Sequence, residues 1–266
     1  MNLTDRQKRE IDYHQKFADS HKHILKQPFS YEVATSERRR WQNAYWQMYT
    51  FLRKQNLKNR NVLIVGCGFG EDALRLAKMG ANVYAFDLSQ DLLDIARELS
   101  LREKLNIDFR RLTAENLDYD SDFFDCVIVR DILHHVEVKR AMSEICRVSK
   151  NSAIFVLDEV YTHSLLDKIR NLSFVKKRIY PKLQNFIYQG NVYITEDERK
   201  LCQSDLFFIK KFLSDIRIKF FYLFVGRVIP SKYDLLDKLD RLIFMAMGPI
   251  GYLFAGRILI FAKINK

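Results

Sequence analysis

The stretch VLIVGCGFGEDALRLAKMGANVYAFDLS, residues 62–89, decides the fold. It contains an apolar run, three alternating glycines (Gly66, Gly68 and Gly70), a helix-like segment, and a second apolar run that closes on Asp87. Short apolar runs bounded by polar residues or glycine are typical of strands that are buried on both faces. The stretch therefore predicts a strand–helix–strand unit of a parallel sheet.

The same alternation continues to residue 159, and crossover connections of this length imply helices on both faces of the sheet. Two later apolar runs are expected to pair antiparallel at one edge. We therefore predict an α/β, Rossmann-like, doubly wound and mostly parallel seven-stranded sheet with an antiparallel last strand. The strands are expected at residues 61–66, 82–87, 106–113, 122–131, 151–159, 216–225 and 256–264.

Helices are expected to surround this sheet. A polar pattern predicts a helix from Thr4 to about Lys22, and a second helix is expected over residues 36–55, with Ser36 or the preceding Thr35 as its cap. In that second helix a stripe of large side chains is expected to serve packing: Trp41, Tyr45, Met48 and Leu52. We predict an N-terminal helical lid or substrate region over residues 1–59. A main domain is expected over 60–266, with a helical cap insertion after the fifth strand, at about 160–205.

The charge of the chain is unevenly distributed. Of the net +11, residues 1–60 contribute +7, residues 61–150 contribute −4 and residues 151–266 contribute +8. Basic flanks favour anionic partners, namely phosphorylated small molecules, nucleic acid or acidic lipid headgroups, although they are also consistent with solvated helices.

Cysteine spacing and the N-terminus give the expected compartment. The four cysteines form no CxxC pair and each lies in an apolar run, so we expect reduced thiols and no metal site. No apolar leader precedes the first helix, and we expect a cytoplasmic protein.

The apolar stretch 242–256 is the candidate for a membrane-spanning segment. It is 15 residues long, short of the roughly 20 that span a bilayer. Gly248, Pro249 and Gly251 interrupt it. A buried helix followed by a turn is the expected structure, with no transmembrane segment, and peripheral membrane contact is the alternative.

The ligand can be inferred from the opening stretch. Glycines let a ligand approach the backbone, the following helix offers unpaired N–H groups, and Asp87 suits ribose hydroxyls. The dinucleotide fingerprint would need glycine where this chain has Glu71, and an acid is a poor neighbour for a pyrophosphate. A ligand with a carboxylate and an ammonium group fits better, and S-adenosylmethionine is such a ligand.

Four stretches in order resemble the class I S-adenosylmethionine-dependent methyltransferases of the type-11 or UbiE-like kind. VLIVGCGFG resembles the first motif of that family and VYAFDLS the second. Residues 112–136 (LTAENLDYDSDFFDCVIVRDILHHV) and residues 141–159 (AMSEICRVSKNSAIFVLDE) resemble the segments around the fourth and fifth strands. One departure is KNS at residues 150–152, where the family usually has KPGG.

The resemblance implies contacts for each part of the cofactor. The three glycines would approach the methionine moiety and Asp87 the ribose hydroxyls. The adenine would meet Leu88, Ala114 and Glu115, and the methionine carboxylate would lie near Arg130.

Transfer to a hydroxyl also requires a base. His134, His135 and Asp131 follow the fourth strand at the edge where such sheets bind ligands, and a structural role is their alternative. Other candidates for the base are Asp158, Glu159, His163 and Tyr161, and His14 is a candidate for part of a lid.

The acceptor is inferred from what the sequence lacks. The [DNS]PP[YFW] sequence of amino-group methylases is missing, and no cysteine lies where a pyrimidine methylase would need one. We expect a small-molecule, glycan or lipid-linked acceptor, methylated at oxygen. An RNA methyltransferase that uses the basic flanks, and a non-catalytic scaffold that binds the cofactor, are the alternatives.

Overall fold

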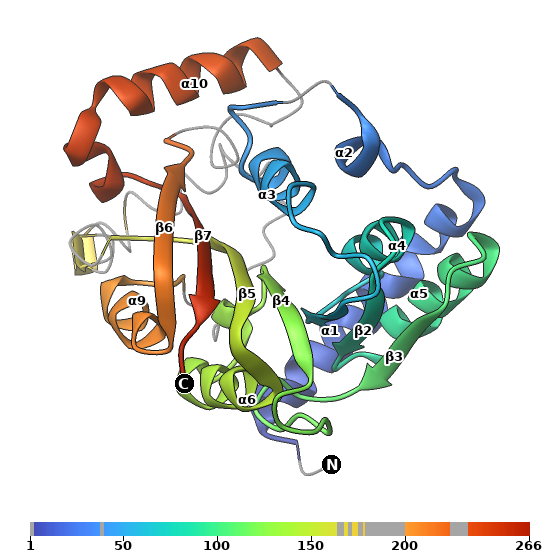
Figure 1. The fold of residues 1–266 in the computed structure, drawn as a ribbon. Helices are drawn as coiled ribbons and strands as arrows, with labels where there is room; N and C mark the ends of the chain where they lie inside the picture. The colour runs from blue at the N-terminus through green and yellow to red at the C-terminus, as the bar shows by residue number, and fades with distance from the viewer. Residues whose placement is uncertain are drawn as a thin grey trace.

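The fold is a seven-stranded sheet between two layers of helices, seen in a computed structural model (Figure 1). The structure describes residues 3–37, 40–163, 168–169, 172–174, 178, 200–223 and 234–266. The strand order is β3-β2-β1-β4-β5-β7-β6. The strands are β1 (Asn61–Val65), β2 (Asn82–Asp87), β3 (Ile107–Arg111), β4 (Phe124–Arg130), β5 (Ser149–Val160), β6 (Leu213–Phe221) and β7 (Arg257–Ile264).

The pairing directions confirm the predicted sheet. β1 to β5 pair in parallel, and β7 runs antiparallel to both β5 and β6. Arg130 pairs with Asp158 at the ends of β4 and β5, and Arg257 at the start of β7 pairs with the last residue of β5. The polar residues that follow these strands are therefore gathered at one edge of the sheet.

Two apolar cores cover the two faces of the sheet. Alternate residues of β1 divide between them: Leu63 and Val65 face one core, Val62 and Ile64 the other. The first core also contains side chains of α6 and α9, and the second contains side chains of α3, α4 and α5. These helices are α3 (Ala44–Leu52), α4 (Glu71–Lys78), α5 (Gln90–Arg102), α6 (Val138–Val148) and α9 (Gln203–Lys210).

The N-terminal helices agree with the prediction in part. The predicted first helix is α1 (Asp5–His21), where Thr4 and Gln7 form a capping box. The predicted second helix is wrong at its start, because Asn43 caps it by accepting the N–H of Trp46 and the helix begins only at Ala44. Ahead of it lie η1 (Lys22–Lys26) and the short α2 (Glu32–Thr35). Met48 and Leu52 are fully buried as expected, whereas Trp41 precedes the helix and is 40% exposed.

The late apolar stretch differs from the prediction. It forms the end of α10 (Asp234–Ala246) and η4 (Gly248–Leu253), but several of its large apolar side chains are exposed rather than buried. Among the described residues no helix combines the length and the apolar character that crossing a membrane requires. Most of the predicted cap insertion at 160–205 lies outside the described residues.

Candidate active site

The turn after β1 brings the backbone of three glycines to the edge of the sheet. All three have positive φ, namely 66° at Gly66, 51° at Gly68 and 78° at Gly70. A Cβ on Gly66 would lie 2.6 Å from Ile132 Cδ1, and one on Gly70 would lie 2.9 Å from Ala96 Cβ. A Cβ on Gly68 would meet nothing within 4 Å. Packing therefore requires the outer two glycines, while Gly68 exposes bare backbone to open space.

Asp87 joins the end of β2 to this turn. Its Oδ2 accepts the N–H of Gly68 at 2.8 Å and its Oδ1 accepts the N–H of Ser89 at 3.0 Å. The residue is only 9% exposed. A buried carboxylate is thus held directly beside the bare backbone.

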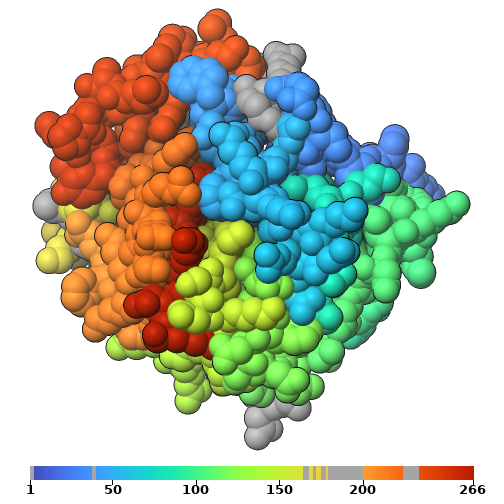
Figure 2. All heavy atoms as spheres, viewed as in Figure 1, coloured from blue at the N-terminus to red at the C-terminus, as the bar shows by residue number. Residues whose placement is uncertain are grey.

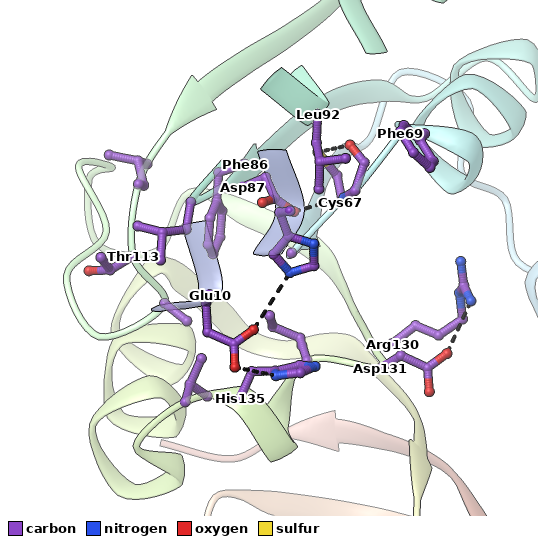
Figure 3. A pocket seen from close by; sticks show the side chains of 18 of the residues that line it. Glu10, Cys67, Phe69, Phe86, Asp87, Leu92, Thr113, Arg130, Asp131 and His135 are labelled. Carbon is purple, nitrogen blue, oxygen red and sulfur yellow. Dashed lines mark hydrogen bonds and ion pairs between the residues drawn. The ribbon is translucent and has the colours of Figure 1, made fainter. Parts of the chain in front are cut away.

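A cavity of about 560 Å³ opens over the turn and Asp87 (Figure 3). This volume lies within the 300–1,000 Å³ typical of small-molecule sites. Of the eight predicted cofactor residues, Gly70 does not line the cavity, because its Cα faces Ala96 and Phe109 in the core. The other seven do: Gly66, Gly68, Asp87, Leu88, Ala114, Glu115 and Arg130.

Helix α1 forms the opposite wall, and the motif-based prediction missed most of it. Five of its side chains, spaced along one helical face, line the cavity: Gln7, Glu10, His14, Phe17 and His21. Their spacing of three and four residues is the sequence signal that identifies such a face. Phe17 also stacks on Phe69 of the glycine turn, with ring centroids 5.4 Å apart.

Polar contacts fix α1 over the cavity. Glu10 Oε1 lies 3.2 Å from His135 Nδ1, and Glu10 Oε2 lies 3.7 Å from His14 Nε2. Arg6 donates to the carbonyl oxygen of His134 at 2.7 Å. The helix is therefore attached to the segment after β4 as well as to the cavity wall.

These contacts shift two pKa values. Burial alone would raise the pKa of Glu10, but the hydrogen bond and charge of His135, with His14 and Arg6, lower it overall. Burial lowers the pKa of His14 below its ordinary 6.5, and the nearby Asp87 and Glu10 only partly oppose that effect. The cavity wall thus carries an ionised carboxylate beside a histidine that favours its neutral form.

Comparison with known proteins identifies this part of the chain. A family model described as a methyltransferase domain matches residues 63–157. Residues 63–157 thus resemble a class I S-adenosylmethionine-dependent methyltransferase domain. β2 to β4 and the cavity residues from Gly66 to Val136 lie within that range, whereas α1, β6 and β7 lie outside it.

Individual relatives match only part of the chain. A ubiquinone biosynthesis O-methyltransferase of Coxiella burnetii is 37% identical over 90 residues, which cover 34% of this chain and 38% of that protein. The chain therefore matches little more than a third of this relative's length.

Solved structures share the fold of the methyltransferase domain and its surroundings. Geranyl diphosphate C-methyltransferase from Streptomyces coelicolor, solved with S-adenosyl-L-homocysteine, has a TM-score of 0.63 at 12% identity and full coverage of both chains. The [4+2]-cyclase SpnF has a TM-score of 0.55 at 18% identity, with 95% of this chain and 96% of that chain covered.

The three predicted catalytic residues of the methyltransferase domain occupy different positions. Asp131 and His135 line the cavity. His134 is 6% exposed and does not line it; its Nδ1 lies 2.7 Å from Oε1 of the fully buried Glu159. Glu159 also accepts the N–H groups of Ile132 and Leu133, so this pair shapes the turn after β4.

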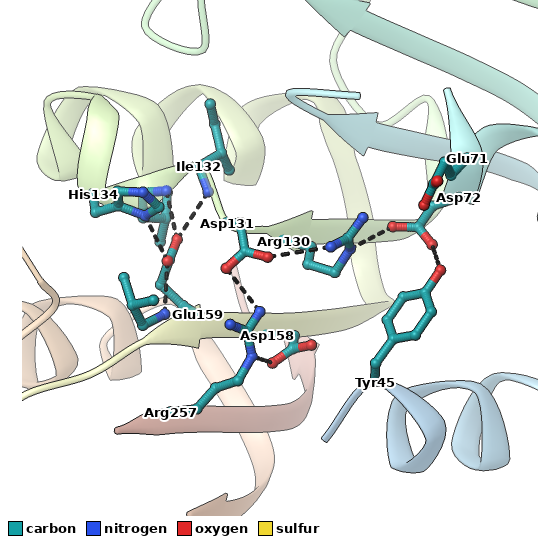
Figure 4. A network of polar contacts seen from close by, with 12 residues as sticks. Tyr45, Glu71, Asp72, Arg130, Asp131, Ile132, His134, Asp158, Glu159 and Arg257 are labelled. Carbon is teal, nitrogen blue, oxygen red and sulfur yellow. Dashed lines mark hydrogen bonds and ion pairs between the residues drawn. The ribbon is translucent and has the colours of Figure 1, made fainter. Parts of the chain in front are cut away.

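Arg130 connects the cavity to α3 and α4 (Figure 4). Its Nε donates to Asp72 at 2.6 Å, and Asp72 also accepts the hydroxyl groups of Tyr45 and Tyr49, each at 2.7 Å. Burial would raise the pKa of Asp72, but Arg130 and these hydrogen bonds lower it overall. The predicted packing residue Tyr45 therefore also orients a charged residue at the site.

Asp131 extends this ion-pair network in a way that the sequence did not indicate, since Arg130 Nη1 donates to its Oδ2 at 3.2 Å (Figure 4). Arg257 donates to Asp131 at 2.7 Å and to Asp158 at 2.6 Å. Asp131 has a φ of 52°, in the left-handed region. Burial raises the pKa of Asp158 although Arg257 opposes that shift. The other base candidates, Tyr161 and His163, are buried and do not line the cavity.

Proposed function

We propose that this protein binds S-adenosylmethionine in the cavity under α1 and transfers its methyl group to an oxygen of a small-molecule, glycan or lipid-linked acceptor. The observation that carries the proposal is the bare backbone of Gly68, hydrogen-bonded to Asp87, inside a methyltransferase domain. The name of the Coxiella burnetii relative supports oxygen as the acceptor atom.

The residues present fit the proposed cofactor. Gly68 leaves room where any other residue would project a Cβ. Asp87 offers carboxylate oxygens for ribose hydroxyls, and Leu88 offers an apolar wall for adenine. Arg130 and Glu71 both line the cavity and provide opposite charges for an amino-acid tail.

The bound cofactor would supply a methyl group activated by a sulfonium. We assign the base to His135, whose Nδ1 contacts the carboxylate of Glu10. In the tautomer that donates Nδ1–H to Glu10, Nε2 carries the lone pair that takes the acceptor's proton. Loss of that proton to His135 would leave the acceptor oxygen as the nucleophile toward the methyl group. The α1 wall excludes water and holds the reactants together.

Calorimetric titration with S-adenosylhomocysteine tests the binding step. We expect S-adenosylhomocysteine to bind and NAD to give no heat. Asp87→Asn should weaken binding by roughly 1.5–3 kcal/mol, the worth of a charged hydrogen bond. Asp94→Asn, at an exposed site on α5, is the matched control. Binding of NAD without S-adenosylhomocysteine would refute the proposal.

Methyl transfer needs a separate assay. Incubation with methyl-labelled S-adenosylmethionine and a panel of phenols, sugars and lipid-linked alcohols should label at least one hydroxyl acceptor. His135→Ala should slow that reaction by about 10²–10⁴-fold with little change in S-adenosylhomocysteine affinity. Cofactor binding without transfer to any acceptor would instead support the non-catalytic alternative, and labelling of RNA alone would support an RNA methyltransferase.

A further inference from the structure

Helix α10 has its acidic side chains facing inward and its leucines facing outward. Asp237 and Asp240 are only 2% and 4% exposed, whereas Leu235 and Leu242 are 69% and 52% exposed. This arrangement reverses the usual one for a helix on a globular protein, in which the apolar side faces the core.

The inward polar face anchors α10 to the protein. Asp240 accepts the N–H of Leu223 at 3.1 Å, and Asp234 accepts from the side chain of Gln42 at 2.8 Å. The guanidinium of Arg241 lies 4.2 Å from the ring centroid of Phe221, at the end of β6. Because these contacts fix the rotation of the helix, its leucines are held facing outward.

The exposed apolar surface extends from α10 into η4. Leu235, Leu239 and Leu242 follow one helical stripe, at positions i, i+4 and i+7. An exposed surface of this kind marks an interaction site. We call the following exposed residues the apolar face of α10 and η4: Leu235, Leu239, Leu242, Ile243, Met245, Ile250, Tyr252 and Phe254.

Exposed cations lie near α10. Burial, together with the charges of Arg241, Arg217 and Lys54, lowers the pKa of Lys219, so each of these cations lies near Lys219. Within the described part of the chain, Lys54, Arg217 and Lys219 form no ion pair with a carboxylate. Figure 2 shows the orange-red side chains of α10 at the rim of the molecule, next to those of β6 and of the segment around α3. A group of like charges is complementary to an anionic surface.

We propose that the apolar face of α10 and η4 docks on an anionic lipid bilayer, with Lys54, Arg217 and Lys219 against the headgroups. Helix α10, 13 residues long, is too short to span a bilayer. An outward apolar face with an aromatic residue and neighbouring cations suits a helix that lies in the plane of the interface. Docking in this position does not depend on the reaction that the protein catalyses.

The position of the face suggests its use. The last residues of β5 and β6 both pair with Arg257, which also contacts Asp131 at the cavity. Because Arg241 of α10 packs on Phe221 at the end of β6, α10 lies at this same edge of the sheet. If the proposed methyl transfer holds, docking brings this edge to the membrane, where a lipid-linked acceptor would be found.

Vesicle co-sedimentation tests the proposal. The wild-type protein should sediment with phosphatidylcholine vesicles that contain phosphatidylglycerol, and less with phosphatidylcholine alone or at high salt, where charges are screened. The triple variant Leu235→Ser, Leu239→Ser, Leu242→Ser should bind at least about tenfold more weakly. Leu101→Ser, at a 77% exposed leucine of α5, is the matched control and should bind like wild type.

Controls of folding and cofactor binding, and a measurement of oligomeric state, distinguish docking from its alternatives. The triple variant should keep its thermal transition and its S-adenosylhomocysteine affinity, because the substituted side chains are exposed and lie outside the cavity. Absence of vesicle binding by the wild type, or unchanged binding by the triple variant, would overturn docking whatever the cofactor result. A wild-type dimer in light scattering that the triple variant converts to a monomer, without vesicle binding, would assign the face to a second copy of this chain.

Discussion

The three glycines after β1 serve different physical purposes. Each has a positive φ, a conformation that costs other residues roughly 1–2 kcal/mol. Gly66 also faces Ile132 so closely that a side chain there must displace it. Gly68 faces the cavity instead, and so its lack of a side chain serves the ligand.

Alanine substitutions should separate these purposes. We expect Gly68→Ala to lower the free energy of unfolding by only about 1–2 kcal/mol, while S-adenosylhomocysteine binding is largely lost because the new Cβ projects into the cavity. Gly66→Ala should destabilise the fold more, since it adds overpacking to the same backbone cost. Urea unfolding and calorimetric titration measure the two effects. Full cofactor affinity in Gly68→Ala would contradict this assignment.

At the residue scale, the sequence indicates which residues converge only where a motif is local. The residues of the glycine turn and the end of β2 are neighbours across one parallel pair, so their convergence follows from the pattern. His134 and His135 are adjacent in sequence, and only the turn after β4 decides which one lines the cavity. Glu10 lies 125 positions from His135, and no local pattern connects them.

At the scale of elements, a titratable cluster attaches α1 to the segment after β4. The pKa of His14 is below 6.5, so the unfolded chain takes up a proton at a higher pH than the folded chain does. Stability should therefore fall as pH decreases from 6.5 towards the lower folded value. Glu10 has a lowered pKa, so its contribution is present above its ordinary 4.5 and is lost only as pH falls through its folded value.

We expect His14→Gln to remove part of this pH dependence. Glutamine does not titrate, so the variant should lose less stability than the wild type between pH 7.5 and 5.5. Urea unfolding at the two pH values measures the difference, and hydrogen exchange of α1 should follow it. His23→Gln, at an exposed site on η1, is the control. An identical pH dependence in His14→Gln and wild type would show that His14 does not couple α1 to pH.

Elements with a repeating hydrophobic pattern could be predicted, and those that depend on tertiary contacts could not. The seven strands follow from apolar runs between helical segments. The start of α3 was misplaced because hydrophobic periodicity does not show whether Ser36 or Asn43 caps the helix. The apolar stretch in α10 was expected to be buried, because the sequence does not reveal that Asp237 and Asp240 find partners inside the protein.

At the scale of the whole molecule, Arg257 ties the C-terminal strand to the active-site edge. Its side chain, 17% exposed, lies between Asp131 after β4 and Asp158 in β5, and it is 126 positions from Asp131 in the sequence. Breaking a buried ion pair by removing one partner typically costs 3–5 kcal/mol, because a charge is left uncompensated. Arg257 leaves two.

Arg257→Met should therefore lower the free energy of unfolding by about 3–5 kcal/mol. Lys263→Met, on the same strand as Arg257, removes a partly exposed ion pair with Asp215 of β6. It should lower the free energy of unfolding by about 1 kcal/mol or less. Urea unfolding of both variants at neutral pH provides the comparison. Equal stabilities of the two variants would mean that the buried network does not hold the strand in place.

The most direct test of the account is a crystal structure of the protein with S-adenosylhomocysteine. The ribose hydroxyls should meet the carboxylate of Asp87, the amino-acid tail should lie along Gly66 and Gly68, and α1 should close over the ligand. A ligand-free cavity at saturating concentration, or a ribose bound away from Asp87, would contradict the proposed cofactor site.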